Sequence, residues 1–567
     1  METIMFAFVT SFINSKLLCT LCVMFVTVSQ AAVHDPRAIA ADPFTATKAI
    51  APALANLGDH QFIVTTDVAA SQAFVNQGYR LTLGFNHSEA LRAFKEAVRL
   101  DPNNAMAYWG WALVLGPNLN LPMQPSVQDQ AFMAVSKAES LKDKVSSREK
   151  AYIEALAVRY SDDKDVSREK LDTDYATAMA KLVKQYPEDL DAATLYAAAI
   201  MNTNPWDYWF RDGSPKQHTQ VILSTLQSVL DRNPNHAGAN HYLIHTVEAF
   251  RPELGVAAAD RLGKLMPGAG HLVHMPSHIY MRVGRYADSY AANAAAIVAD
   301  EGYITQCRAQ GLYPLGYYPH NIHFLVWSAM FQGRSNAAIA AARQVADKIP
   351  KFGGENTWGL NEAFLSQPLF VLVRFGQWKA IQAEPRPHKN ARFITGVWLY
   401  AQGMAAIHQG QLKRAQKHLE SLNDMQKIVA SDANYYVGFG AAGQLLAIAN
   451  NVLAGEIEGK KENYTKAISH LEKAARLEDA LMYNEPPDWY FPVRHILGAL
   501  LLEANLPAEA EVVYWEDLRR NPENGYSLFG LKQSLLAQDN IAVAKVIDNR
   551  FVKAWADADV VLTSSRF

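Results

Sequence analysis

Seven of the 17 histidines in this chain lie within one central stretch and fall into three groups. The groups are His241 and His245 with the nearby Glu248, then His271, His274 and His278, then His320 and His323. Spacings of three, four and seven place the members of each group on one face of a helix, provided that each segment is helical. Imidazoles at such spacings with a carboxylate nearby are typical ligands of divalent metals. The groups therefore predict a divalent metal centre, with zinc or copper expected first and iron as a further candidate.

The chemistry of such a centre depends on how many ions it holds. Three histidines, or two with a carboxylate, bind one ion and leave one coordination position open. The eight residues exceed the needs of one ion, so a two-metal centre and a single site with supporting histidines both stay open. Bound water would then attack a substrate, with Glu248 as ligand or catalytic base, and copper would allow redox cycling. A metal-dependent hydrolase or oxidoreductase acting on a small molecule or peptide fits this pattern.

The histidine groups also have interpretations without metal. They fit a hydrogen-bonded polar surface, or a pH-sensitive or substrate-binding surface. Pro276 lies between His274 and His278 and should kink or begin a helix, since proline lacks an N–H. Pro319 similarly marks the place where a helix would begin just before His320.

Two further segments combine aromatic and charged residues and are candidates for substrate binding. Segment 204–209 contains Trp206 and Asp207, which would wall a pocket or pack as a hydrophobic loop. Segment 484–495 contains Glu485, Trp489 and Arg494, which would bind substrate if the chain curls back on itself, or form a buried salt bridge between repeats. No glycine-rich phosphate loop, nucleophile elbow or HExxH motif occurs in the sequence.

Helical repeats are the elements that must position these groups. Segment 71–102 has diagnostic residues at positions 4, 8, 11, 20, 24, 27 and 32: Phe74, Gly78, Leu81, Ala90, Phe94, Ala97 and Pro102. This pattern resembles the tetratricopeptide repeat, in which small residues let two helices approach closely. The register recurs in 491–522 and 396–422, with weaker copies in 319–350 and 464–474. We expect an all-α solenoid of tetratricopeptide type, a right-handed superhelix with loop insertions.

The repeat register also predicts where the histidines lie. Counting from Pro234, Gly284 and Pro350 places all seven histidines and Glu248 at positions 2, 5, 9 or 12 of three consecutive repeats. In tetratricopeptide proteins these positions line the concave groove. We therefore expect the metal centre, and any small molecule or peptide substrate, in that groove. The alternative is a metal-free scaffold whose groove binds a peptide or partner protein.

Several segments are similar to exported bacterial tetratricopeptide proteins of a functionally uncharacterised type. They are 84–87 (GFNH), 105–118 (AMAYWGWALVLGPN), 271–286 (HLVHMPSHIYMRVGRY) and 487–494 (PDWYFPVR). The resemblance covers most of the chain and implies the fold, but it implies no activity.

The N-terminal segment and the composition set the expected context. Residues 1–31 are apolar and end in Ser29-Gln30-Ala31, typical of a cleaved signal peptide, with a retained membrane anchor as the alternative. We expect a periplasmic or secreted protein with no membrane span in the mature chain, a lead-in at 32–70 and a single repeat array at 71–567. Of three cysteines only Cys307 would remain, and we expect it to be buried and inert.

Charge argues against one class of partner. The 53 Lys and Arg residues nearly balance the 56 Asp and Glu residues, giving a net charge of −3. A nucleic-acid protein usually shows a basic excess, so we expect no nucleic-acid partner. Half of the residues are hydrophobic, which favours a folded core over disorder.

Overall fold

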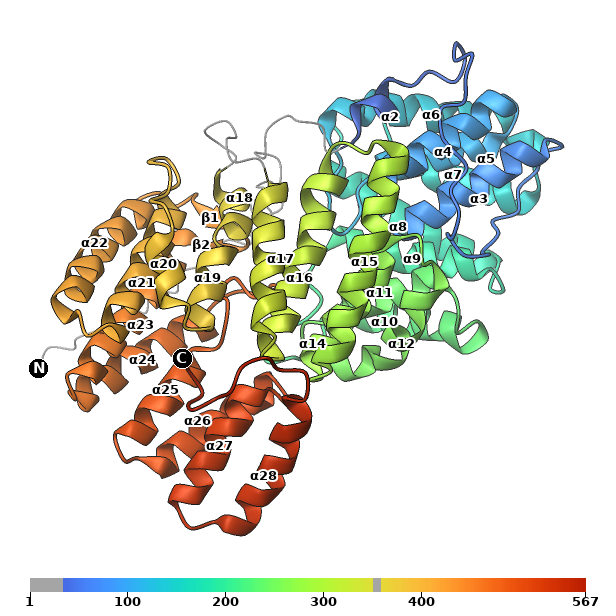
Figure 1. Cartoon of the computed structure of the whole chain (residues 1–567). Helices are drawn as coiled ribbons and strands as arrows, with labels where there is room; N and C mark the ends of the chain where they lie inside the picture. The colour runs from blue at the N-terminus through green and yellow to red at the C-terminus, as the bar shows by residue number, and fades with distance from the viewer. Residues whose placement is uncertain (1–33, 350–357) are drawn as a thin grey trace, which may run out of the picture.

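The computed structural model describes residues 34–349 and 358–567, which form a succession of antiparallel helices (Figure 1). The predicted signal peptide, 1–31, lies outside the described residues. Each helix packs mainly against its neighbours in sequence, as expected of a helical-repeat array. The predicted all-α repeat fold is therefore confirmed.

The helices up to residue 349 are α2 (Pro36–Ala40), α3 (Ala69–Leu83), α4 (His87–Leu100), α5 (Ala105–Leu115), α6 (Gln128–Leu141), α7 (Ser147–Ala157), α8 (Arg168–Gln185), α9 (Leu190–Thr203), α10 (Gln217–Arg232), α11 (Ala237–Val247), α12 (Val256–Leu265), α13 (Gly270–His274), α14 (Pro276–Arg282), α15 (Tyr286–Cys307), α16 (Tyr318–Phe331) and α17 (Ser335–Lys348). The later helices are α18 (Trp358–Leu365), α19 (Gln367–Arg374), α20 (Trp378–Ala383), α21 (Arg392–His408), α22 (Leu412–Ala430), α23 (Ala442–Lys460), α24 (Tyr464–Asp479), α25 (Val493–Glu503), α26 (Pro507–Arg520), α27 (Gly525–Ala537) and α28 (Ile541–Ala554). A hairpin of β1 (Tyr436–Val437) and β2 (Gly440–Ala441) precedes α23.

Close helix pairs explain the glycines of the repeat pattern. A Cβ on Gly78 would lie 2.9 Å from the ring of Phe94, and one on Gly498 would lie 2.4 Å from the ring of Tyr514. In both repeats the glycine is at position 8 and the aromatic residue is at position 24. The aromatic ring therefore fills the space that a side chain at position 8 would need.

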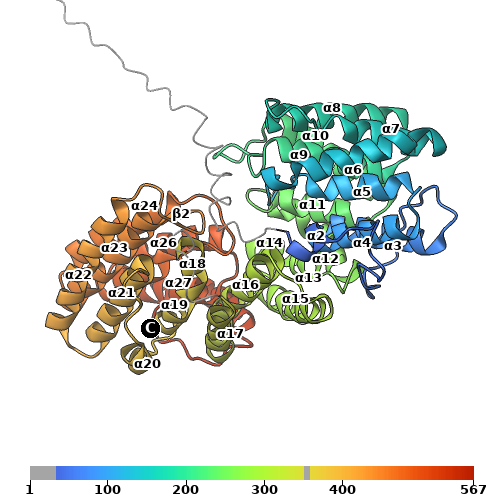
Figure 2. The ribbon, with the colours of Figure 1, turned by 90° about the horizontal axis from the view of Figure 1, so that it is seen from above.

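The two largest hydrophobic cores among the described residues meet near the middle of the array. One core joins residues from Ala38 to Tyr280, and the other joins residues from Met281 to Ile547. Figure 2 shows the two lobes meeting near α14 and α16. The C-terminal helices return to this junction, where the Tyr286 hydroxyl donates to the Pro522 carbonyl at 2.7 Å. The superhelix thus brings late segments of the chain against the central helices.

Segment 302–318, which links two helices of the array, is largely helical. Helix α15 continues to Cys307, and a π-helical turn at Tyr313–Tyr317 leads into α16. Burial of Tyr303 and Cys307 against Tyr313 stabilises this arrangement despite the weak helix propensity of Gly302. Cys307 is buried as predicted, and burial raises the pKa of its thiol to about 12, which makes it inert at neutral pH.

No helix in the described part of the chain combines the length and the hydropathy needed to cross a lipid bilayer.

Candidate metal centre

Four short helices near the junction of the two lobes carry the histidine groups. His241 and His245 lie one turn apart on α11, and Glu248 follows as the residue that ends this helix. His271 and His274 lie on α13, and α14 begins at Pro276, as predicted, so that His278 lies one turn further on. His320 lies near the start of α16. Because α13 packs against α16 and α11 packs against α14, the groups converge.

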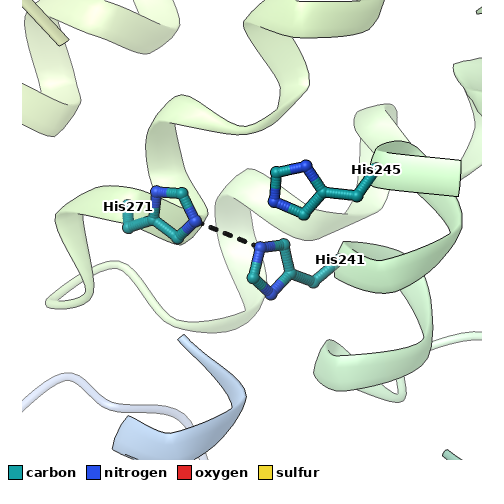
Figure 3. Close-up of side chains that lie close together, drawn as sticks. All are labelled: His241, His245 and His271. Atoms are coloured by element: carbon teal, nitrogen blue, oxygen red, sulfur yellow. Dashed lines mark hydrogen bonds between the residues drawn. The ribbon is translucent and has the colours of Figure 1, made fainter. Parts of the chain in front are cut away.

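The first triad consists of His241, His245 and His271. Their candidate ligand atoms all lie within 4.8 Å of one another, and each residue is at most 3% exposed. Nε2 of His241 lies 3.1 Å from Nε2 of His271, and Figure 3 shows a ring nitrogen of His245 turned toward this pair. A tetrahedral ion with metal–nitrogen bonds of about 2.0–2.1 Å needs nitrogens about 3.3 Å apart. Small ring movements would therefore suffice to bind an ion.

The second triad consists of His274, His278 and His320, and it meets the same distance criterion of 4.8 Å. Nε2 of His274 lies 3.0 Å from Nε2 of His278. The two triads are neighbours, because the ring centroids of His271 and His274 are 6.1 Å apart, as are those of His245 and His278. They form one continuous histidine cluster.

Hydrogen bonds behind the rings fix the tautomers of two ligands. Nδ1–H of His241 donates to the Leu83 carbonyl at 2.7 Å. Nδ1–H of His274 donates to Oδ1 of Asn293 at 2.7 Å, and the Asn293 amide donates in turn to the Ser289 carbonyl, which fixes its orientation. Both rings therefore present the Nε2 lone pair to their triad, as metal ligands do.

Two buried carboxylates complete the cluster. Glu248 lies with Oε1 3.3 Å from Nδ1 of His245 and Oε2 3.0 Å from Nδ1 of His278. Oε2 of Glu485 also lies 3.0 Å from Nδ1 of His278. Glu485 comes from the loop between α24 and α25, so the C-terminal lobe contributes directly to the centre.

Burial and charge set the protonation of the cluster. Burial, reinforced by neighbouring imidazoles, lowers the pKa of His241, His271, His274 and His320 well below the usual value. His278 differs: burial opposes its charge, but Glu248 and Glu485 raise its pKa to about 10. When no ion is bound, a proton on His278 thus lies between its Nε2 atom and that of His274. The four rings whose pKa is lowered are neutral, which is the form that binds metal.

A phenyl ring packs on each triad. The Phe85 ring lies 4.5, 5.8 and 5.6 Å from the rings of His241, His245 and His271. The Phe324 ring lies 4.6, 4.5 and 5.0 Å from the rings of His274, His278 and His320. Sequence reasoning did not identify either phenylalanine as part of the site. The only signal was that Phe85 belongs to the segment 84–87 singled out by resemblance.

The cluster is therefore enclosed and does not lie in an open concave groove. Phe85 and Leu83 at the end of α3 cover it on one side, and the Glu485 loop covers it on another. The repeat register predicted a common face for the histidines, which the two triads share. It did not predict that segments from both ends of the array would cover that face.

The remaining predicted residues lie at varied distances from the cluster. His323 is outside both triads: its ring lies edge-on to Phe364 at 5.7 Å, and burial lowers its pKa to about 4. Trp206 lies edge-on to His245 at 5.2 Å and is 41% exposed. Asp207 next to it forms an ion pair with Lys216.

Two of the candidate substrate residues, Trp489 and Arg494, make their contacts within the C-terminal lobe. Trp489 is buried against Phe370 and Tyr400. Arg494 forms an exposed ion pair with Asp479 at 2.7 Å.

A separate His60–Asp191–His236 group has metal-like spacing but different chemistry. The Ala239 N–H donates to Nδ1 of His236 at 3.2 Å, so the neutral ring carries its proton on Nε2 and donates it to Asp191 at 3.2 Å. The Tyr79 hydroxyl donates to the same carboxylate oxygen at 2.9 Å. We interpret this group as a hydrogen-bonded network that holds the lead-in segment.

Comparison with known proteins adds little to this description. No family model and no curated protein matches the chain. Among solved structures, it is similar to the human IFIT1 dimer with PPP-AAAA, at 12% identity over 87% of this chain and 92% of that one, with a TM-score of 0.27. It is also similar to the APC/C hetero-tetramer Cut9-Hcn1, at 11% identity over 87% and 95% of the chains, with a TM-score of 0.29. TM-scores this low carry no argument about fold or function. The chain's own geometry shows an all-α helical-repeat protein of tetratricopeptide type with a buried His/Glu cluster.

Proposed function

We propose that this chain is an exported metalloprotein whose His/Glu cluster binds divalent first-row metal ions. The observation that supports this most is the convergence of six histidines from three separate sequence groups into two triads. Within the described residues, the buried Nε2 atom of His245 has no hydrogen-bond partner. Leaving a buried polar atom unpaired costs about 1–3 kcal/mol, and coordination of an ion would offset that cost.

The ligand chemistry favours particular ions. Imidazole-rich sites without thiolate suit zinc and copper, and the two adjacent carboxylates extend the choice to iron. A three-histidine site leaves one position for water or substrate, which is the arrangement of catalytic rather than structural metal sites. We therefore propose a metal-dependent enzyme that acts on a small molecule or peptide by hydrolysis or oxidation.

Metal content tests the proposal. The mature protein would be purified without a histidine tag, and its metals measured by inductively coupled plasma mass spectrometry, beside a His245→Ala/His278→Ala variant. His323→Ala is the matched control, because His323 lies on the same helix as His320 but outside both triads. We expect one or two equivalents of metal in the wild type and the control, and none in the double variant. Folded protein that is metal-free and cannot be reconstituted would rule the proposal out.

A groove in the C-terminal lobe supports a second candidate function, a scaffold that binds a peptide or partner protein. Helices α22, α23 and α24 line a cavity of about 580 Å³. Its walls carry the carboxamides of Asn423, Gln426 and Asn450 and the ammonium groups of Lys466 and Lys473. Carboxamides pair well with peptide N–H and C=O groups. Peptide binding that persists in the His245→Ala/His278→Ala variant would favour this scaffold function. The expectation that the protein has no nucleic-acid partner stays a prediction.

A further inference from the structure

The Glu248 carboxylate touches one histidine of each triad on the side that faces away from the candidate ion. Its Oε1 lies 3.3 Å from Nδ1 of His245, and its Oε2 lies 3.0 Å from Nδ1 of His278. On the opposite side of each ring, Nε2 of His278 lies 3.0 Å from Nε2 of His274. Nε2 of His245 is buried and has no hydrogen-bond partner among the described residues. The two nitrogens of an imidazole point away from each other. A group bound at Nδ1 therefore cannot ligate the ion that the same ring holds at Nε2.

The same arrangement occurs at the other ligands. Nδ1 of His241 donates to the Leu83 carbonyl, and Nδ1 of His274 donates to Asn293. Three rings, those of His241, His245 and His274, thus have a hydrogen-bond acceptor at Nδ1. The Nδ1 of His278 forms an ion pair with Oε2 of Glu248 at 3.0 Å instead. Such an acceptor fixes the tautomer and orientation of a metal-bound histidine, and its removal typically weakens metal binding about 10- to 100-fold.

Glu248 is the acceptor that the two triads have in common. It is 1% exposed and is therefore shielded from bulk water. Glu485, by contrast, contacts His278 and no other histidine of the triads among the described residues, at 3.0 Å. The two carboxylates are similarly buried, but Glu248 contacts a histidine of each triad, whereas Glu485 contacts a histidine of the second triad alone.

Building on the proposed metal-binding function, we infer that Glu248 is a positioning residue shared by two three-histidine sites, each of which holds its own ion. Glu248 is then neither ligand nor base, and its loss weakens both sites together. One carboxylate oxygen holds the first site through His245, and the other holds the second site through His278. Glu485 adds a second acceptor to His278 and supports the second site alone.

Cobalt(II) titration of the metal-free full-length protein tests this inference, with visible d–d absorption and bound-metal analysis as readouts. The variants are Glu248→Gln, Glu485→Gln, His245→Ala and His278→Ala. Glutamine keeps the shape of glutamate, but its single oxygen can accept from only one of the two imidazole N–H groups. Far-UV circular dichroism checks that each variant is folded.

We expect two cobalt ions per wild-type chain, and one in each histidine variant. Glu485→Gln should weaken one of the two binding steps. Glu248→Gln should weaken both steps, because both imidazoles lose the carboxylate charge. The step whose imidazole also loses its acceptor should weaken by about 10- to 100-fold, and the protein should still reach two equivalents at saturating cobalt.

Other outcomes would overturn the inference. Loss of a single equivalent in Glu248→Gln, with the other step unchanged, would make Glu248 a ligand of one ion. A wild-type stoichiometry of one, or loss of both ions in His245→Ala, would show a single centre and leave the proposed metal-binding function intact. A wild type that binds no cobalt would remove the proposed function and this inference with it.

Discussion

The phenyl rings on the two triads lead to a reciprocal prediction about metal exchange. Phe85 packs on all three rings of the first triad, with centroids 4.5 to 5.8 Å away, and is 5% exposed. Phe324 packs likewise on the second triad, with centroids 4.5 to 5.0 Å away. We expect Phe85→Ala to loosen the first site and leave the second site unchanged, and Phe324→Ala to do the opposite.

The size of the expected loss in metal affinity follows from the three imidazole rings that each phenyl ring holds in place. Truncating a buried phenylalanine to alanine typically costs about 3–5 kcal/mol of stability, and the polar space left here would admit water. If each of the three imidazoles regains about 0.5 kcal/mol of rotamer freedom, metal binding weakens by about 1.5 kcal/mol. That corresponds to about a tenfold loss of affinity. Phe85→Leu keeps most of the volume and should give a smaller effect.

Metal transfer to a coloured chelator provides the assay. The wild type should release its two ions in two phases, which His245→Ala and His278→Ala assign to the first and second triads. Phe85→Ala should accelerate only the phase that His245→Ala lacks. Equal acceleration of both phases, or of neither, would refute the idea that each phenyl ring encloses one triad.

Three further predictions concern stability and the surroundings of the centre. Burial lowers the pKa of His323 to about 4 and that of His87 to about 3. As the pH falls below 6.5, these two histidines bind protons in the unfolded chain but not in the folded chain. Each histidine therefore lowers the free energy of unfolding of the metal-free protein by about 2 kcal/mol at pH 5. Replacing either with Gln should flatten the fall in denaturation midpoint between pH 7 and 5, and an unchanged fall would contradict this. Gly110→Ala should lower the melting temperature, because its Cβ would lie 2.1 Å from an aromatic ring, whereas Gly302→Ala should raise it slightly, since nothing lies within 4 Å. Copper bound at the first triad should quench the emission of Trp206, whose ring is 5.2 Å from that of His245, so the emission difference between wild type and Trp206→Phe should disappear on copper addition.

The helical array could be predicted because its signals are local. A glycine at position 8 and an aromatic residue at position 24 of one repeat already specify how that pair of helices packs, as Gly78 and Phe94 show. The π-helical turn before α16 had no such signal. There the burial of Tyr303 and Cys307 against Tyr313 outweighs weak local propensity.

The sequence by itself determined that the histidines occupy the same face of successive helices, because helical spacing fixes which side chains share a face. Only the tertiary structure decided how they are grouped. His271 and His274 lie one turn apart on α13, yet they join different triads. The ring of His271 lies beside those of His241 and His245 on α11, whereas the ring of His274 lies beside that of His320 on α16. The contribution of Glu485 also depends on the superhelix curling back, which no local spacing encodes. Which helix faces share a cavity is set by the packing of the whole array, and that packing turned three sequence groups into two triads joined by one carboxylate.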